Sequence, residues 1–200
     1  EMSASLVGSE MCIRDRITQN PEISIVVETM GGTKPAYAFV KACLEAGKHV
    51  ATSNKELVAA HGPELLEIAK AHHVSFLFEA SVGGGIPIIR PLVSSITSDA
   101  VTEITGILNG TTNYMLTKMS EDGLDYDAVL EDAQERGYAE RNPAADVEGH
   151  DARRKIAILS SLAFGKYVDY EDVYTEGITK ITSADFAYAK VLGSRIKLFG

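Results

Sequence analysis

The amino-acid sequence predicts an α/β protein in which part of a parallel sheet precedes an α+β region. Between residues 23 and 82, short β-branched or aromatic runs alternate with segments of helical period. This alternation is typical of a parallel sheet with right-handed crossovers. After residue 82 the alternation stops and amphipathic helical patterns dominate. We therefore expect two structural regions that join near residues 82–86.

The first region is expected to run strand, helix, strand, helix, strand. ISIVVETM predicts a buried strand over 23–30, which a glycine pair ends. Apolar residues at helical spacing and a terminal glycine predict a helix over 34–47. HVATS predicts a strand over 49–53. A helix with proline in its first turn is expected over 62–73, and a third strand over 75–82.

The second region is expected to mix helices and strands. A glycine turn and a helix come first, over 83–96, and an alternating, half-buried strand follows over 100–110. The remaining expected elements are helices over 111–123, 125–137, 151–165 and 183–193, and short strands over 173–178 and 195–200.

Composition limits the function classes. The 200 residues carry a net charge of -9 without a block of lysine or arginine, which argues against nucleic acid or an anionic membrane as a partner. No apolar run reaches the length of a membrane span. Cys12 and Cys43 are too few for a disulfide framework or a zinc site, and no secretory pattern opens the chain. We expect a cytoplasmic location.

Asp151 and Lys155 lie on the apolar face of the helix expected over 151–165. At about 100° per residue they share an arc with Ile158 and Leu162. A carboxylate and an amine that point inward must satisfy each other, because a buried unpaired charge is costly. Such a pair is either a structural ion pair or part of a functional site, and the pattern alone leaves both interpretations open.

Two further segments carry candidate chemistry in the first region. Lys55 follows a strand at the carboxyl edge of the sheet, where ligands bind in open α/β folds, although an exposed loop lysine is the more common case. Glu79 precedes the glycine cluster 83–85. That turn can cradle a phosphate, hold a monovalent cation through carbonyl oxygens, or act as a hinge.

A third segment, between residues 137 and 155, gathers acidic side chains near one lysine. Glu140, Asp146, Glu148 and Asp151 precede Lys155, and their spacing is not that of an EF-hand. Carboxylates with one lysine suit a zwitterionic amino-acid substrate. The carboxylates can hold its ammonium group, and the lysine can exchange a proton with its carbonyl or hydroxyl oxygen.

Taken together, these segments resemble homoserine dehydrogenases. The resemblance runs in order from about residue 22 to residue 200. It is carried by ETMGG, TSNKELVAAHG, EASVGGGIPII, GILNGTTNYML, GYAERNPAADVEGHDARRK and EGI followed by SADFAYAKVLGSRIKL. It implies an NAD(P)-dependent oxidoreductase that reduces L-aspartate 4-semialdehyde to L-homoserine in threonine, methionine and isoleucine biosynthesis.

The resemblance also implies a domain organisation and a homodimer. It implies a partial Rossmann-like NAD(P)-binding domain over 17–82 and a truncated catalytic and dimerisation domain over 83–200. Residues 1–16 resemble translated sequencing-adapter sequence, so we expect a non-native arm there. No GxGxxG motif occurs, and the family's last catalytic segment is not recognised. We therefore expect a chain that is incomplete at both ends and weakly active or inactive.

Site residues follow from the resemblance by position. It implies that Lys155 donates the proton to the aldehyde oxygen, with Asp151 beside it, and that Lys55 serves both catalysis and binding. Glu140 and Asp146 are the implied substrate-binding acids.

A nicotinamide cofactor and a metal ion are implied in the same way. Thr29, Gly31 and Lys55 are expected to contact the cofactor, NADP or NAD. A sodium-like cation is expected on backbone oxygens of Glu79, Val82, Gly84 and Ile86.

Two alternatives stay open. One is a related two-domain dehydrogenase that acts on a different small aldehyde or amino acid. The other is a non-enzymatic fragment in which the pair of Asp151 and Lys155 is only structural.

Overall fold

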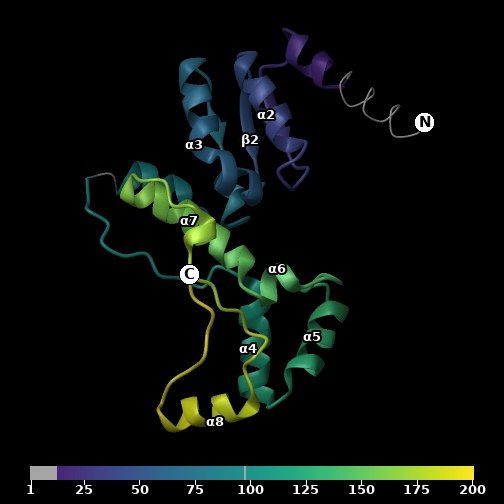
Figure 1. Cartoon of the computed structure of the whole chain (residues 1–200), viewed down its shortest axis with the longest axis vertical. Coiled ribbons are helices and arrows are strands. Elements are labelled where there is room, and N and C mark those ends of the chain that lie inside the picture. Colours follow the sequence, from purple (N-terminus) through teal and green to yellow (C-terminus); the bar gives the residue numbers. More distant parts are fainter. Residues whose placement is uncertain (1–12, 97) are drawn as a thin grey trace, which may run out of the picture. The chain divides into compact units, whose positions relative to one another are not determined.

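The computed structural model describes residues 13–96 and 98–200, and the chain divides into two compact units between Ser98 and Asp99 (Figure 1). The α/β fold class is confirmed. In the first unit the strands are β1 (Ile25–Glu28), β2 (His49–Thr52) and β3 (Phe76–Leu77), and the helices are α2 (Ala36–Glu45) and α3 (Lys55–Ala71).

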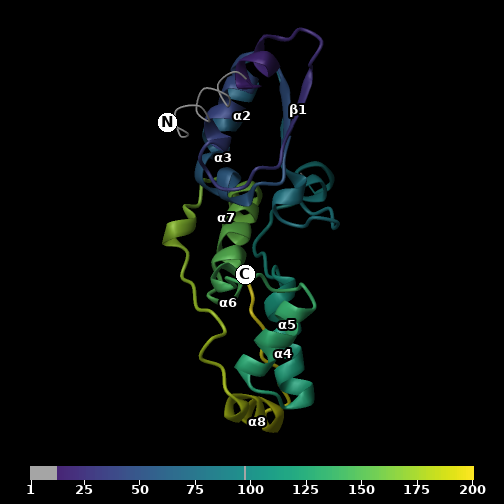
Figure 2. The ribbon, with the colours of Figure 1, turned by 90° about the vertical axis from the view of Figure 1, so that its right-hand side faces the viewer.

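The three strands form a parallel sheet in the order β1-β2-β3. Ile25 pairs with His49, and Ala51 with Leu77. Helices α2 and α3 lie along the same side of the sheet (Figure 2). Ile25 and Val27 point away from that side and are 65% and 68% exposed, so β1 is half-buried rather than fully buried.

Two boundaries in the first unit differ from the predicted ones. Helix α3 begins at Lys55 instead of residue 62, because Asn54 caps it: the Asn54 side chain accepts a hydrogen bond from Leu57 N at 3.1 Å. Pro63 therefore lies inside the helix. Strand β3 ends at Leu77, and a 3₁₀ turn follows over Glu79–Ser81.

The start of the described chain is helical. Residues 13–19 form a helix that we did not predict. Residues 1–12 of the expected non-native arm lie outside the described residues.

The second unit is built of helices, most of which pack around a shared hydrophobic core. Its helices are α4 (Gly110–Asp122), α5 (Tyr126–Glu135), α6 (Ala144–Val147), α7 (His150–Phe164) and α8 (Ser183–Val191). Helix α8 lies at one end of α4 (Figure 1). The core joins α4, α5, α6 and α8 through Met115, Leu116, Met119, Val129, Ala133, Ala139, Val147, Ile178 and Phe186.

The helices predicted over 111–123, 125–137, 151–165 and 183–193 are confirmed, whereas the three strands predicted in this unit are wrong. Residues 100–110, 173–178 and 195–200 form no strand in the described part of the chain. Gly106 and Gly200 exchange backbone hydrogen bonds of 3.1 and 2.9 Å. A single exchanged pair does not make a ladder, and an extended segment without one is not a strand.

No helix of the described residues has the length and apolarity that crossing a bilayer requires.

Candidate active site

An ion pair between a buried aspartate and a partly buried lysine lies at the start of helix α7. Lys155 Nζ lies 2.7 Å from Asp151 Oδ2, and the two side chains are 15% and 4% exposed. The chain enters the helix through Gly149, whose φ of 84° is in the left-handed region. Asp151 lies in the first helical turn, where the helix dipole favours a carboxylate. The inward orientation predicted from helical phase is therefore confirmed.

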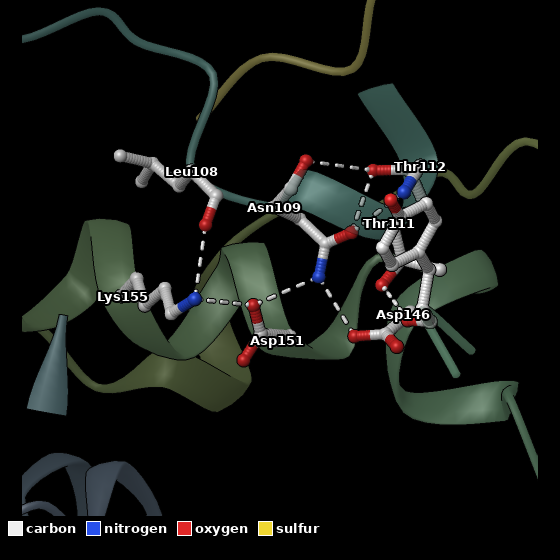
Figure 3. Close-up of polar contacts among 8 residues, drawn as sticks. Leu108, Asn109, Thr111, Thr112, Asp146, Asp151 and Lys155 are labelled. Carbon is white, nitrogen blue, oxygen red and sulfur yellow. Dashed lines mark hydrogen bonds and ion pairs between the residues drawn. The ribbon is translucent and has the colours of Figure 1, made fainter. Parts of the chain in front are cut away.

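Residues 108 and 109 hold this pair from the opposite side (Figure 3). Lys155 Nζ donates to the carbonyl oxygen of Leu108 at 2.9 Å. Asn109 Nδ2 donates to Asp151 Oδ2 at 3.0 Å and to Asp146 Oδ1 at 2.7 Å. We call Asn109, Asp146, Asp151 and Lys155 the polar cluster.

Three helices bring the polar cluster together. Asn109 is the N-cap of α4, and its Oδ1 accepts from the N–H and the hydroxyl of Thr112, both at 2.8 Å. Asp146 belongs to α6, and Asp151 and Lys155 belong to α7. Residues almost fifty positions apart in the chain thus meet within the second unit.

The cluster holds two carboxylates and one ammonium, so its formal charge is -1. A group with a positive charge is attracted to it. Lysine carries three N–H donors, of which Leu108 and Asp151 engage two. The third can be offered to an oxygen that gains negative charge. The arrangement can therefore bind a cationic group and donate a proton beside it.

Glu140 and His150 lie outside this network. The Glu140 side chain is exposed, and Gln134 Nε2 donates to its backbone carbonyl at 3.0 Å. His150 Nε2 lies 3.1 Å from Glu148 Oε2. The structure brings Asp146, Asp151 and Lys155 together, and it places Glu140 beside α5.

In the first unit, polar groups at the carboxyl ends of β1 and β2 fix a turn. Glu28 is 4% exposed, and its carboxylate accepts from Thr52 Oγ1 and from Met30 N, both at 2.6 Å. Asn54 Nδ2 donates to the Gly32 carbonyl at 2.6 Å.

This turn presents two of the expected cofactor residues. Thr29 and Gly31 are exposed, and Gly31 has a φ of 77°. An exposed turn at the carboxyl edge of a parallel sheet fits a nucleotide cofactor. Lys55, the third expected residue, is the first residue of α3 in this unit.

Glu79 anchors the glycine-rich turn with its side chain. Its carboxylate accepts from the N–H groups of Ile88, Ile89 and Arg90 at 2.6, 2.8 and 2.8 Å. Desolvation tends to raise the pKa of Glu79, but these backbone donors and the Arg90 charge outweigh it, so the pKa lies below its ordinary value.

The backbone of this turn has donors of the type that a monovalent cation needs. A Cβ on Gly83 would lie 2.5 Å from the Ile86 carbonyl oxygen, so only glycine allows this close approach. No group of three His, Cys, Asp or Glu side chains in the described residues can hold a metal ion. An ion here would therefore rest on carbonyl oxygens, the donor type expected for Glu79, Val82, Gly84 and Ile86.

The sequence analysis did not single out Leu108 or Asn109. It ended a strand at Asn109-Gly110, although asparagine directly before a helical segment is also an N-cap signal. That signal locates the start of α4. The contact of Asn109 with both carboxylates depends on how α4, α6 and α7 pack, which no local pattern shows.

Both parts of the chain match models of known protein families. Residues 87–200 match the family model described as "Homoserine dehydrogenase". Residues 9–79 match the model described as "Homoserine dehydrogenase, NAD binding domain".

Individual relatives agree with these matches. The chain is 51% identical over 184 residues to a homoserine dehydrogenase of Synechocystis sp., and 46% identical to that of Bacillus subtilis. Each alignment covers 92% of this chain and 42% of the relative, so the chain spans less than half the length of these curated relatives.

Solved structures show the same likeness. The crystal structure of a homoserine dehydrogenase from Thiobacillus denitrificans matches with a TM-score of 0.90 and 46% identity, over 94% of this chain and 43% of that one. A hyperthermophilic archaeal homoserine dehydrogenase in complex with NADPH matches with a TM-score of 0.78 and 29% identity, over 85% of this chain and 52% of that one.

Proposed function

The chain belongs to the homoserine dehydrogenase family, and we propose that its polar cluster is the substrate site for the reduction of L-aspartate 4-semialdehyde to L-homoserine. The observation that supports this most is the ion pair of Lys155 with Asp151. Asn109 donates hydrogen bonds to Asp151 and to Asp146, so a lysine and two carboxylates lie in one network. The substrate carries an ammonium and an aldehyde, and the cluster offers carboxylates and an ammonium donor.

Lys155 is the proton donor in this proposal. Hydride addition to an aldehyde builds negative charge on its oxygen, and an ammonium next to that oxygen stabilises the charge and supplies the proton. Leu108 and Asp151 fix the direction of the Lys155 side chain. Asp151 thereby keeps the amine oriented for transfer.

The acids bind the substrate ammonium. Asp146 presents its carboxylate from α6, with one oxygen held by Asn109. Glu140, exposed on the loop after α5, is the second proposed substrate-binding acid. Lys55 is proposed to contact both substrate and cofactor from the start of α3.

NADP or NAD is the proposed cofactor, and it supplies the hydride when bound. Thr29 and Gly31, in the exposed turn after β1, are the residues proposed to contact it. The NADPH complex of the archaeal relative agrees with this choice. A sodium ion on the carbonyl oxygens of Glu79, Val82, Gly84 and Ile86 is part of the same proposal.

The wider setting is also a proposal. It comprises an NAD(P)-binding domain over 17–82, a catalytic and dimerisation domain over 83–200, a homodimer, and a cytoplasmic location. Gel filtration with light scattering tests the dimer.

A chimera provides the test of the proposed function. Residues 17–200 of this chain replace the matching segment of the Synechocystis relative, and NADPH oxidation is followed with aspartate 4-semialdehyde. Lys155→Ala is expected to lower kcat by about a hundredfold or more, the scale of general acid catalysis, without loss of folding. Lys166→Ala, at an exposed lysine just beyond α7, is the matched control and should retain activity.

Three results contradict the proposal. An inactive wild-type chimera would reject it outright. Equal or faster turnover of a one-carbon-longer semialdehyde would favour a different dehydrogenase. Unfolding of Lys155→Ala together with unchanged activity per folded molecule would leave the ion pair with a structural role only.

A further inference from the structure

Asn109 is the only side chain among the described residues that contacts both carboxylates of the polar cluster. It is 6% exposed, and its side-chain hydrogen bonds to Asp146, Asp151 and Thr112 all lie inside the second unit. The oxygen and the nitrogen of its side-chain amide have different partners. Oδ1 caps α4 through Thr112, and Nδ2 faces Asp146 and Asp151 (Figure 3).

We infer that Asn109 is a positioning residue, which sets the spacing and orientation of the two substrate-site carboxylates through its Nδ2 group. This inference rests on the proposed function of the cluster. Asn109 is assigned no contact with substrate or cofactor. It acts through Asp146 and Asp151.

Electrostatics gives Nδ2 a role that a neutral packing contact would not have. Two carboxylates at short range repel each other, and of these two Lys155 forms an ion pair with Asp151. The two N–H bonds of Nδ2 point to Asp146 Oδ1 at 2.7 Å and Asp151 Oδ2 at 3.0 Å, so one amide satisfies one oxygen of each acid. Hydrogen bonds to charged acceptors are stronger than neutral ones, and they fix geometry as well as energy.

This hydrogen bond fixes the orientation of the Asp146 carboxylate. Asn109 holds Oδ1, and no described residue donates a hydrogen bond to Asp146 Oδ2. The second oxygen is therefore presented to a ligand in one orientation. A substrate ammonium would meet this oxygen at a fixed distance from Lys155, because residues 108 and 109 hold the lysine and the acid through adjacent groups.

The helix cap and the carboxylate bridge can be separated by mutation. Asn109→Ser and Asn109→Asp both keep an oxygen that can cap α4, because serine, aspartate and asparagine are all favoured N-caps. Both remove the Nδ2 donor, and Asn109→Asp also places a third negative charge beside the other two. Asn113→Ser is the matched control. It removes an amide from the same helix, where Asn113 Oδ1 accepts only from Lys197 Nζ at 2.7 Å, away from the carboxylates.

Kinetics of the chimera described above, together with its unfolding midpoint, test the inference. Asn109→Ser should raise KM for aspartate 4-semialdehyde and lower kcat/KM on the order of tenfold or more, as expected for hydrogen bonds to charged groups. Asn109→Asp should show a larger decrease in kcat/KM for aspartate 4-semialdehyde than Asn109→Ser. In both Asn109 variants KM for NADPH should stay within about twofold of wild type, because the carboxylate spacing does not set it. Asn113→Ser should keep the wild-type KM and kcat/KM for aspartate 4-semialdehyde, because it leaves the carboxylates unchanged.

The outcomes separate the two proposals. Wild-type activity with unchanged constants in Asn109→Ser would reject the positioning role and leave the proposed function intact. The positioning role would also be rejected if the activity lost in Asn109→Ser only matched the loss of folded protein, or if Asn113→Ser lost the same activity. A wild-type chimera that does not turn over would reject the proposed function and, with it, this inference.

Discussion

Glu79 shows how one carboxylate organises a turn at the scale of a single residue. Its two oxygens accept from three consecutive backbone N–H groups, of Ile88, Ile89 and Arg90. These donors stabilise the charged form, so the pKa of Glu79 is lower in the folded chain than in the unfolded chain. The stabilisation is present above the unfolded-state pKa, about 4.3, and it is lost as the pH falls through the lower folded-state pKa.

Glu79→Gln is therefore expected to destabilise the chain at neutral pH more than in acid. The amide keeps one acceptor oxygen but no charge. Urea unfolding midpoints of wild type and variant should differ most above about pH 5 and converge as the pH falls through the lowered folded-state pKa of Glu79. Glu67→Gln, at an exposed position of α3, should show no such gap. A gap that is constant from pH 3 to pH 7 would mean that the charge of Glu79 is not what holds the turn.

Residue-scale prediction from sequence succeeded where the signal was local. Asp151 and Lys155 are four positions apart on one helix, so helical phase was enough to predict their burial and contact. Asn109 and Asp146 come together through the packing of α4 against α6, which in turn packs against α7. Asp146 was predicted as a site residue from the family resemblance, whereas Asn109 was not predicted.

At the scale of elements, a glycine controls how the segment after α7 meets α6. A Cβ on Gly177 would lie 2.2 Å from the Val147 carbonyl oxygen and 2.5 Å from Glu148 Cα. The next residue, Ile178, is 2% exposed and donates its N–H to Val147 O at 2.8 Å. The close approach of two backbones thus depends on the missing side chain.

Gly177→Ala is expected to lower the free energy of unfolding by about 1–3 kcal/mol or more, because backbone atoms cannot move aside as a flexible side chain can. Gly165→Ala is the comparison: its φ is 63°, nothing lies within 4 Å of the new Cβ, and only backbone strain of about 1 kcal/mol applies. Urea unfolding of the purified chain measures both. Equal stability of Gly177→Ala and wild type would show that residues 173–178 do not lie against α6.

Helical and strand patterns differed in how well they predicted elements. The four helices predicted for the second unit over 111–123, 125–137, 151–165 and 183–193 are present, because a helix completes its hydrogen bonds within itself. In the first unit α2 is also present, whereas α3 begins seven residues before its predicted start. Residues 100–110 alternate like a strand, yet a strand exists only where a partner completes its ladder. Alternation in this segment therefore predicted a strand that the described chain does not form.

At the scale of the whole molecule, the division into two units predicts where a protease cuts first. Ser98, Asp99 and Ala100 are exposed at the boundary between the units. Domain boundaries fall in exposed segments that few contacts cross. A protease specific for the amino side of aspartate should cleave at Asp99 before it cleaves Asp132 or Asp151, which lie in helices.

Mass spectrometry of a time course follows the products 1–98 and 99–200, which should appear before any product of cleavage at Asp132 or Asp151. The same digestion in urea is the control, since unfolding makes all aspartates accessible. Initial cleavage within α5 or α7 would contradict the division into two compact units.

The exposed flank of β1 has a consequence for the behaviour of the chain in solution. Among the described strands β1 lies at an edge of the sheet, its outward Ile25 and Val27 are 65% and 68% exposed, and it contains no lysine or proline. Such an edge is a template for strand addition by another chain, and natural edges are normally blunted by charge or proline. The net charge of -9 at pH 7 keeps copies apart, and this repulsion vanishes near the pI of 5.0. Precipitation through edge-to-edge sheets is thus favoured in mildly acidic buffer, and low salt at neutral pH preserves the protection.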